Sequence, residues 1–422
     1  MKNKFIKNTL VLIIGGFITK ILGMFIKIIM TRNISSEAIG LYMMILPSYN
    51  LFITIISGGL EVSISKLVSE NILDKSKILV TSIKTNIITS IFLIIVIILL
   101  SKPICILLHN KDLYIPILSM LLSIPFIGIS TILKGYLFGN NKMHAHVISN
   151  FFEQITRILL FIIFLPKMNN NITAVTFIIS SNLISELVSI FILSLFIKDI
   201  KITNLKIDKE IKKEILNISI PSCLSRLIGT ISYFFEPILL TNLLILNGYS
   251  SNYITTEYGI LTGYSMQLLL LPSFFSMAIS QSIIPLISNA YINKKYTYIK
   301  KKIKEIILLS FMIGFIYILL ILLKPEFYMK LIYNTKEGIK YLKIMAPIFI
   351  LLYIQSPLTS ILQSINKSKE VMKVSIIGTI IKIIFMIILS FMNMGIYSLI
   401  IPILINIVFV TIYNYIKIIN SF

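Results

Sequence analysis

The chain has 422 residues, of which 56% are hydrophobic and 13% charged, and its mean hydropathy is +0.93. Soluble domains have about a quarter of their residues charged, so this composition excludes an ordinary soluble globular protein. The formal charge of +22 does not indicate a nucleic-acid partner. Most of the lysines lie in short segments between apolar runs, where they orient helices and meet anionic lipid headgroups. We therefore expect an all-α polytopic membrane protein that does not bind nucleic acid.

Apolar runs of membrane-crossing length recur along the whole chain. The first run contains lysines and is too long for the apolar region of a signal peptide, so we expect a signal anchor. Cys105 and Cys223 lie in or beside apolar runs and predict no disulfide framework. The twelve predicted spans are 9–30, 38–60, 82–101, 113–138, 146–166, 174–197, 215–244, 258–287, 305–323, 341–363, 371–391 and 395–416.

The distribution of lysine and arginine predicts the orientation of these spans. Most of the basic residues share one side when the N-terminus is cytoplasmic, although the segment 324–343, with five lysines, is an exception. We expect both termini on the cytoplasmic side of the cell membrane. The longest polar connection, residues 198–216, mixes charge with periodic Ile and Leu and predicts an amphipathic surface helix. We divide the chain into an N-terminal lobe at 1–197, a linker at 198–214 and a C-terminal lobe at 215–422.

The two predicted lobes repeat each other in sequence. The tripeptide LPS at 46–48 recurs at 271–273, an offset of 225 residues. At the same offset Asn141-Lys142 matches Asn366-Lys367, and Arg157 matches Lys382. Six spans in each half give both halves the same topology, so we expect two pseudo-symmetric six-helix lobes around a central cavity.

The first span also has a counterpart, at an offset of 206 residues. TKILG at 19–23 matches SRLIG at 225–229, which places Lys20 opposite Arg226. The shorter offset predicts an extra loop after span seven, and the polar stretch 247–258 supplies one. The segment GYLFG at 135–139 is a GxxxG pattern, which predicts close packing between helices.

We assign eight charged residues to the membrane interior, where a basic residue costs about 2.5–3.5 kcal/mol on insertion scales: Lys20, Lys27, Arg157, Arg226, Lys382, Glu153, Glu186 and Glu236. Glu153 and Arg157, at i and i+4, are able to pair within one helix, and Glu186 is a candidate partner for Lys382. We group these four as an intramembrane charge network: Glu153, Arg157, Glu186 and Lys382.

The remaining charges favour a binding site for an anion. Lys20 and Lys27 have no acid in their own span, and a polar stripe from Arg226 to Glu236 follows one face of span seven. Polar stripes of membrane helices usually face a bundle interior or a wet cavity. We expect a positively charged cavity that holds an anion rather than a cationic drug. The candidate substrate-binding residues are Lys20, Lys27, Arg226, Tyr233 and Glu236.

Signatures of enzymes and metal sites are absent from the sequence. The chain has no GxxxxGK[ST] phosphate loop. All its aspartates lie in predicted loops, and His144 and His146 form the only histidine pair, without carboxylate or thiol ligands nearby. We expect no enzyme activity, no metal and no cofactor. Coupling to the membrane potential or to a monovalent cation is left open.

Six segments, taken in order, resemble the signature segments of the stage V sporulation protein B family, in the multidrug/oligosaccharidyl-lipid/polysaccharide exporter superfamily. The resemblance implies two six-helix lobes, alternating access and undecaprenyl-linked cell-wall intermediates as substrates, including peptidoglycan for the spore cortex. It also implies that Lys20 and Arg226 are the cavity cations. The segments are KILGMFIKIIMTRNISSEAIGLYMMILPSYNLF, SGGLEVSISKLVSE, ILKGYLFGNNKM, FFEQITRI, IPSCLSRLIG and LLLLPSFFSMAISQSIIPLISNAY.

Members of that family commonly have one further pair of spans, which in related lipid II flippases helps to form a groove for the lipid tail. Our main hypothesis is a flippase for an undecaprenyl-diphosphate-linked saccharide, with membrane lipids and cell-wall synthesis proteins as partners. Two competing hypotheses are a drug/cation antiporter of the same superfamily and a non-transporting membrane scaffold for cell-wall assembly. A double substitution of Lys20 and Arg226 in a flipping assay separates the three.

Overall fold

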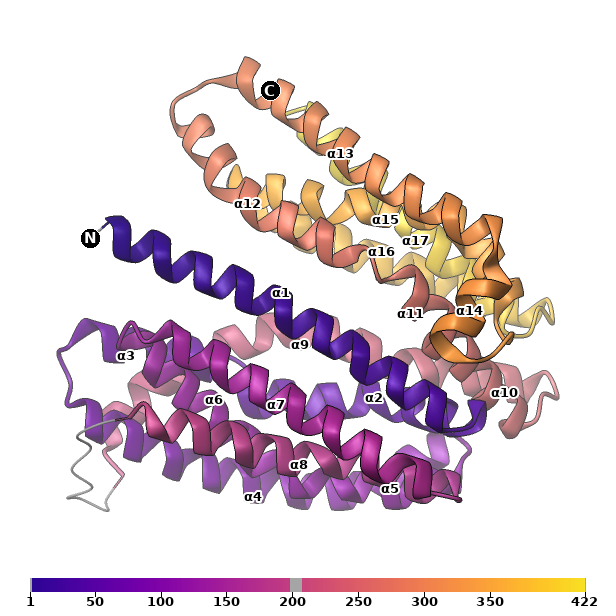
Figure 1. The fold of residues 1–422 in the computed structure, drawn as a ribbon, viewed down its shortest axis with the longest axis horizontal. Helices are drawn as coiled ribbons and strands as arrows, with labels where there is room; N and C mark the ends of the chain where they lie inside the picture. The colour runs from indigo at the N-terminus through magenta and orange to yellow at the C-terminus, as the bar shows by residue number, and fades with distance from the viewer. Residues whose placement is uncertain (1, 198–206, 422) are drawn as a thin grey trace. The chain divides into compact units, whose positions relative to one another are not determined.

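The computed structural model describes residues 2–197 and 207–421, and in these ranges the ordered elements are all helices (Figure 1). Within the described ranges, eleven helices are long and apolar enough to cross a membrane, and a bent helix pair brings the number to twelve. Each of the twelve predicted spans corresponds to one of these. The predicted all-α polytopic architecture is therefore confirmed. The contacts divide the chain into two compact units, Met1–Thr241 and Asn242–Phe422.

The first unit is a helical bundle in which glycine allows one sharp bend. Its second span breaks at Gly59, whose φ of +82° is left-handed and therefore favours glycine. A Cβ at Gly59 would lie 2.5 Å from the backbone oxygen of Ser219, so the glycine also allows close approach to a later helix. The helices of this unit are α1 (Lys2–Asn33), α2 (Ser36–Ser57), α3 (Leu60–Glu70), α4 (Lys75–Leu107), α5 (Tyr114–Ser119), α6 (Ile124–Gly139), α7 (Met143–Phe164), α8 (Asn171–Leu195) and α9 (Lys209–Leu246) as far as Thr241.

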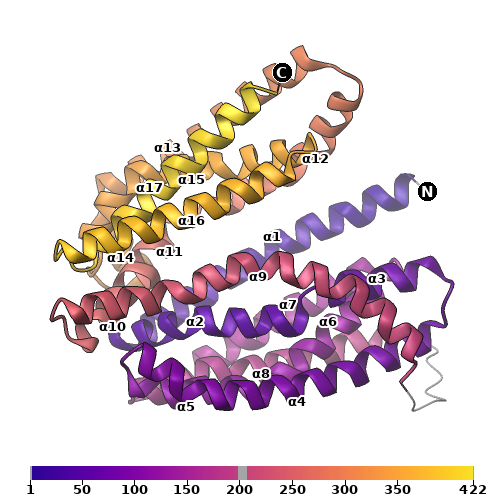
Figure 2. The same cartoon turned by 180° about the vertical axis from the view of Figure 1, so that it is seen from behind.

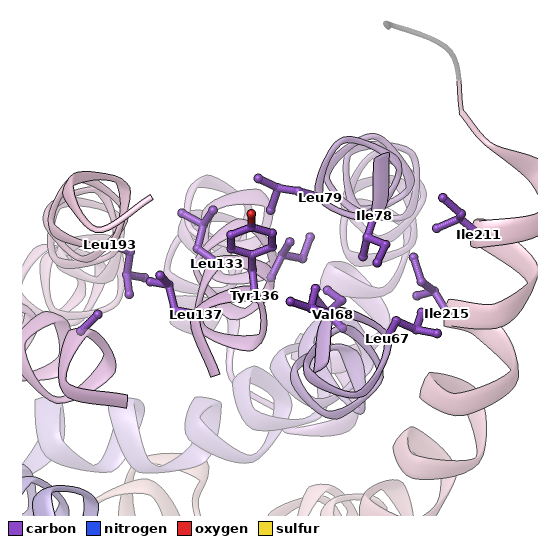
Figure 3. Close-up of a cluster of buried hydrophobic side chains, with 13 residues drawn as sticks. Leu67, Val68, Ile78, Leu79, Leu133, Tyr136, Leu137, Leu193, Ile211 and Ile215 are labelled. Carbon is purple, nitrogen blue, oxygen red and sulfur yellow. The ribbon is translucent and has the colours of Figure 1, made fainter. Parts of the chain in front are cut away.

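The start of α9 belongs to the core of the first unit. Ile211 and Ile215 project from α9 toward Leu67, Val68 and Ile78 (Figure 3). The part of the predicted linker from residue 209 onward is therefore the beginning of α9, not a separate surface helix, and residues 198–206 lie outside the described residues. By packing, α9 belongs to the first unit up to Thr241, whereas the sequence assigned this span to the C-terminal lobe. The apolar side chains of its first turns explain the difference, because they are buried against α3 and α4.

The GxxxG segment packs as predicted. A Cβ at Gly135 would lie 2.8 Å from the backbone oxygen of Glu61, and one at Gly139 would lie 2.7 Å from that of Ser65. These glycines let α6 approach the backbone of α3 more closely than any side chain would permit.

The second unit contains the bent span. Its two parts meet at an angle of 53°, at a break that includes Pro272. The predicted extra loop at 247–258 is largely helical, because α10 begins at Ser251. The elements of this unit are α10 (Ser251–Gly259), the π-helical turn η4 (Ile260–Ser265), α11 (Met266–Leu269), α12 (Ser273–Ile292), α13 (Tyr296–Leu323), α14 (Pro325–Tyr333), α15 (Ile339–Ser364), α16 (Ser368–Phe391) and α17 (Tyr397–Ile419) (Figure 2).

Two tyrosines donate hydrogen bonds to backbone carbonyls at the break. The Tyr317 hydroxyl donates to the carbonyl oxygen of Leu268 at 2.7 Å. The Tyr353 hydroxyl donates to that of Leu269 at 2.5 Å. A bend inside an apolar span is tolerated only when neighbouring helices supply such donors.

The two units share a turn at positions 225 residues apart. Asn141 between α6 and α7 has φ 59°, and Asn366 between α15 and α16 has φ 62°. After each asparagine a lysine reaches the end of a later helix: Lys142 Nζ donates to the Phe196 carbonyl at 2.8 Å, and Lys367 Nζ donates to Ser421 Oγ at 2.7 Å. This matching geometry supports the duplication that the sequence offset predicted.

Candidate functional site

A buried charge cluster lies between α6, α7 and α8 of the first unit. Glu153 of α7 is only 8% exposed and is shared by two cations. Its Oε1 lies 3.2 Å from Arg157 Nη2, and its Oε2 lies 3.5 Å from Lys134 Nζ. The predicted pairing of Glu153 with Arg157 is confirmed, and α6 supplies a second cation that the sequence analysis had not placed here.

The cluster continues onto α8. Arg157 Nη2 donates to Ser185 Oγ at 3.1 Å, and the next residue, Glu186, is 8% exposed. Glu186 interacts electrostatically with Lys134, Glu153 and Arg157, and its Oε2 accepts no hydrogen bond from the described residues. Two carboxylates and two cations therefore face one another, and their formal charges balance.

Burial gives this cluster a strong influence on stability. Transfer of two charges from water to the protein interior costs free energy, and only a well-aligned ion pair with hydrogen bonds offsets that cost. Removal of one partner leaves an uncompensated buried charge, at a cost of about 3–5 kcal/mol. Substitution of Glu153 should have the largest effect, because both cations pair with its carboxylate. We define Lys134, Glu153, Arg157 and Glu186 as the buried network.

Lys134 is a residue of the buried network that the sequence analysis did not assign to the membrane interior. It lies in the last third of α6, and its side chain is 13% exposed. Its position inside the predicted span 113–138 was the available signal. Lys142, eight residues later, does lie in the turn between α6 and α7, so the two lysines are easily assigned together to a loop.

Glu61 of α3 links the buried network to α9. It is partly buried and interacts electrostatically with Lys134, and also with Arg226 of α9. Its backbone is held against Gly135, the neighbour of Lys134, by the close packing of α3 on α6. The sequence analysis did not single out Glu61, because its partners come from helices far away in the chain.

The candidate cations on α1 and α9 lie at the surface of the described structure. Lys20, Lys27 and Arg226 are all exposed, and Lys20 lies within electrostatic range of Lys27. Helix α1 packs on α7, where a Cβ at Gly15 would lie 2.3 Å from Val147. The predicted pairing of Lys20 with Arg226 stays a prediction.

The polar stripe of α9 changes from exposed to buried along its length. Arg226 is exposed, Tyr233 is partly buried, and Glu236 is 9% exposed. Tyr233 interacts electrostatically with Glu236, and also with Tyr42 of α2. Only the Arg226 end of the stripe is therefore accessible to a large ligand in this structure.

The second unit lacks the acidic part of the buried network. At an offset of 225 residues, Lys134 corresponds to Thr359, Glu153 to Gly378 and Glu186 to Thr411, while Lys382 corresponds to Arg157. Thr359 Oγ1 accepts a hydrogen bond from Asn414 Nδ2 at 3.2 Å. Lys382 of α16 is partly buried. The repeated scaffold is therefore charged in one unit and mostly neutral in the other.

Among the described residues, no group of three or more His, Cys, Asp or Glu side chains could hold a metal ion. His146 lies beside Asn150, with 3.1 Å between Nε2 and Nδ2, and packs against the ring of Phe138.

Family models and relatives in sequence both place the chain among proteins of polysaccharide biosynthesis and sporulation. A family model described as "Polysaccharide biosynthesis protein" matches residues 5–291, and one described as "MatE" matches residues 261–388. The chain is 32% identical to "Stage V sporulation protein B" of Bacillus subtilis (strain 168), over 90% of this chain and 77% of that protein. It is 26% identical to "Sporulation protein YkvU" of the same organism, over 87% of this chain and 84% of that protein.

Solved structures with a similar fold include multidrug resistance transporters. An inward-facing multidrug resistance MATE family transporter of the MOP superfamily matches with a TM-score of 0.74 at 18% identity, over 94% of this chain and 93% of that chain. An outward-facing structure of such a transporter matches with a TM-score of 0.63 at 16% identity, over 98% and 94%. At these identities the likeness shows the fold.

Proposed function

Because the chain belongs to the polysaccharide biosynthesis protein family, within the MOP superfamily of membrane transporters and flippases, we propose that it translocates an anionic, undecaprenyl-linked saccharide by alternating access. The finer parts of this proposal are the saccharide substrate, its diphosphate linkage and a role in making the peptidoglycan of the spore cortex. The similarity to stage V sporulation protein B supports them. The proposed location is the cytoplasmic membrane with both termini inside, and cell-wall synthesis proteins are proposed partners.

The observation that carries the proposal is the set of exposed cations on α1 and α9. Lys20, Lys27 and Arg226 lie on apolar helices of membrane-crossing length, and all three are exposed. Basic residues at such depth are costly and mark substrate or ion pathways. Guanidinium and ammonium groups are the usual ligands of phosphate oxygens. Three such groups in one unit suit a diphosphate better than an organic cation.

In the proposed mechanism, Lys20, Lys27 and Arg226 bind the diphosphate while the polyprenyl chain stays in the lipid. Tyr233 and Glu236, farther along α9, are partly buried and buried in this structure, and they contribute hydrogen-bonding groups toward the saccharide only after a conformational change exposes them. A membrane potential that is negative inside favours outward movement of the anion by about 2.3 kcal/mol per charge per 100 mV. The buried network joins α6, α7 and α8, and Glu61 lies within electrostatic range of both Lys134 and Arg226.

The test is a head-group translocation assay in proteoliposomes with the double variant Lys20→Gln/Arg226→Gln. Loss of two charge-assisted contacts, each with a net value of about 1.5–3 kcal/mol, should lower the initial rate by at least about tenfold. The conservative variant Lys20→Arg/Arg226→Lys should retain most of the rate. The matched control Lys324→Gln/Lys330→Gln removes two exposed charges outside the candidate spans and should behave like the unchanged protein. An unchanged rate in the first variant would refute the cation mechanism.

A drug/cation antiporter is the second candidate, favoured by the match of residues 261–388 to the "MatE" model and by the multidrug transporter folds. Efflux of an organic cation from proteoliposomes, without movement of a lipid-linked saccharide, would establish it. If neither substrate moves while complexes with cell-wall synthesis proteins still form, the scaffold hypothesis is correct.

A further inference from the structure

The second unit carries a long apolar groove along α17, with a volume of about 580 Å³. At 1.5 Å per residue, its α17 lining from 401 to 416 extends for about 22 Å. This is longer than the hydrocarbon region of one leaflet, about 15 Å. Ile348 of α15 completes the groove, and the α17 residues that line it are Ile401, Leu404, Ile405, Val408, Phe409, Ile412, Tyr413 and Ile416.

The groove lining selects a hydrocarbon occupant. Among the described residues that line the groove, Tyr413 is the only polar one, and its hydroxyl already donates to Glu370 Oε2 at 2.9 Å. An occupant with polar groups along its length would bury them without partners, at a cost of a few kcal/mol each. A hydrocarbon chain has no such groups.

One end of the groove meets a charged cluster. Lys417, adjacent to Ile416, places Nζ 3.1 Å from Glu370 Oε2 and 5.4 Å from the centre of the Tyr413 ring. Lys373 is exposed and acts electrostatically on the same carboxylate. Two lysines against one glutamate leave a net positive charge at this end of the groove.

The surrounding surface strengthens that positive charge. Ala290, Ile299, Ile365 and Ile418 belong to one hydrophobic cluster, so the α12–α13 turn and the ends of α15 and α17 lie at the same end of the unit. Glu305 is paired with Lys302 at 2.6 Å. The exposed lysines of the α12–α13 turn and the start of α13 are Lys294, Lys295, Lys300, Lys301 and Lys304.

We propose that this groove and its basic end form a binding site for an anionic phospholipid of the bilayer. One acyl chain lies along α17, and the phosphate lies against Lys417 and Lys373. Glu370 keeps Lys417 beside the groove, and Lys373 supplies charge that Glu370 does not balance. Basic pockets between membrane helices are a known mode of lipid headgroup recognition. The proposal does not depend on the flippase function.

The test exploits the absence of tryptophan from the chain. Phe409→Trp places a single fluorescent reporter in the groove, and Phe315→Trp places a matched reporter on an exposed position of α13. The full chain is reconstituted in phosphatidylcholine vesicles with small amounts of brominated phosphatidylglycerol or brominated phosphatidylcholine. Phosphatidylglycerol should quench Phe409→Trp with about fivefold higher apparent affinity, since one lysine beside a lipid phosphate contributes about that factor. Phe315→Trp should show no preference.

Two further measurements assign the headgroup and the source of the lipid. Lys417→Gln/Lys373→Gln in the Phe409→Trp background should abolish the preference, while Lys324→Gln/Lys330→Gln should preserve it. Equal quenching by the two brominated lipids, or a preference that survives Lys417→Gln/Lys373→Gln, would overturn the proposal. Relief of quenching by undecaprenyl phosphate but not by unlabelled phosphatidylglycerol would assign the groove to the polyprenyl carrier instead, and would also overturn it. Thermal unfolding of each variant verifies that it is folded.

Discussion

Two equivalent regions of this protein share a turn geometry and differ in the side chains between their helices. The α6–α8 region of the first unit and the α15–α17 region of the second contain the same asparagine turn and the same lysine contact to a later helix end. Between the helices, the first unit has the buried network, whereas the second has Thr359, Gly378 and Thr411 at the corresponding positions. Turn geometry is a local property, so duplication preserves it while interior side chains take separate roles.

The largest expected effect is loss of the shared carboxylate in the first unit. Glu153→Gln leaves Lys134 and Arg157 without their common anion, and should lower the free energy of unfolding by about 3–5 kcal/mol. Thermal unfolding in a fixed detergent measures the change. The control Glu305→Gln alters an exposed pair and should leave the unfolding temperature nearly unchanged. Equal effects of the two variants would contradict a stabilising network.

An intermediate effect should distinguish helix contacts in the two units. In Gly135→Ala the new Cβ would meet the backbone oxygen of Glu61 at 2.8 Å, whereas in Gly378→Ala it would meet a Val410 methyl at 2.9 Å. Overpacking costs about 1–3 kcal/mol, and backbone yields less than a side chain, so Gly135→Ala should be the more destabilising. Gly23→Ala, with nothing within 4 Å of the new Cβ, is the control. The reverse order of unfolding temperatures would show that α3 and α6 are not tightly packed.

The smallest expected effect concerns a solvent-exposed ion pair at the surface of the second unit. Lys336 donates a hydrogen bond to Glu326 of α14 at 2.6 Å, and this bond and the lysine charge hold the pKa of Glu326 below its usual value. A lowered folded-state pKa means that the pair stabilises the fold above the unfolded pKa and that this contribution is lost as the pH falls through the folded pKa. Lys336→Gln should therefore raise the pKa of Glu326 toward its ordinary value, as followed by NMR titration, with little change in stability at neutral pH. An unchanged titration would mean that the pair does not form in solution.

The sequence predicted the twelve spans and the interior acids, because both are properties of short windows. Hydropathy over about twenty residues identifies a span, and Glu153 and Arg157 at i and i+4 are neighbours on any helix. Lys134 escaped detection because its contact with Glu153 depends on how α6 packs against α7. The assignment of α9 to the first unit was not predicted for the same reason, since its apolar turns could be buried against either unit.

By itself, then, the sequence determined the class of protein, the number of spans, the repeat and the charged residues that must be accounted for. Hydropathy and helix periodicity are properties of short stretches of sequence, and they suffice to identify the class and the spans. Only the tertiary structure decided that Glu153 pairs with two cations, that Glu61 lies within electrostatic range of both Lys134 and Arg226, and that α17 carries a groove ending at Lys417. Such contacts join residues of different helices, and helix packing, which depends on many side chains at once, selects among them.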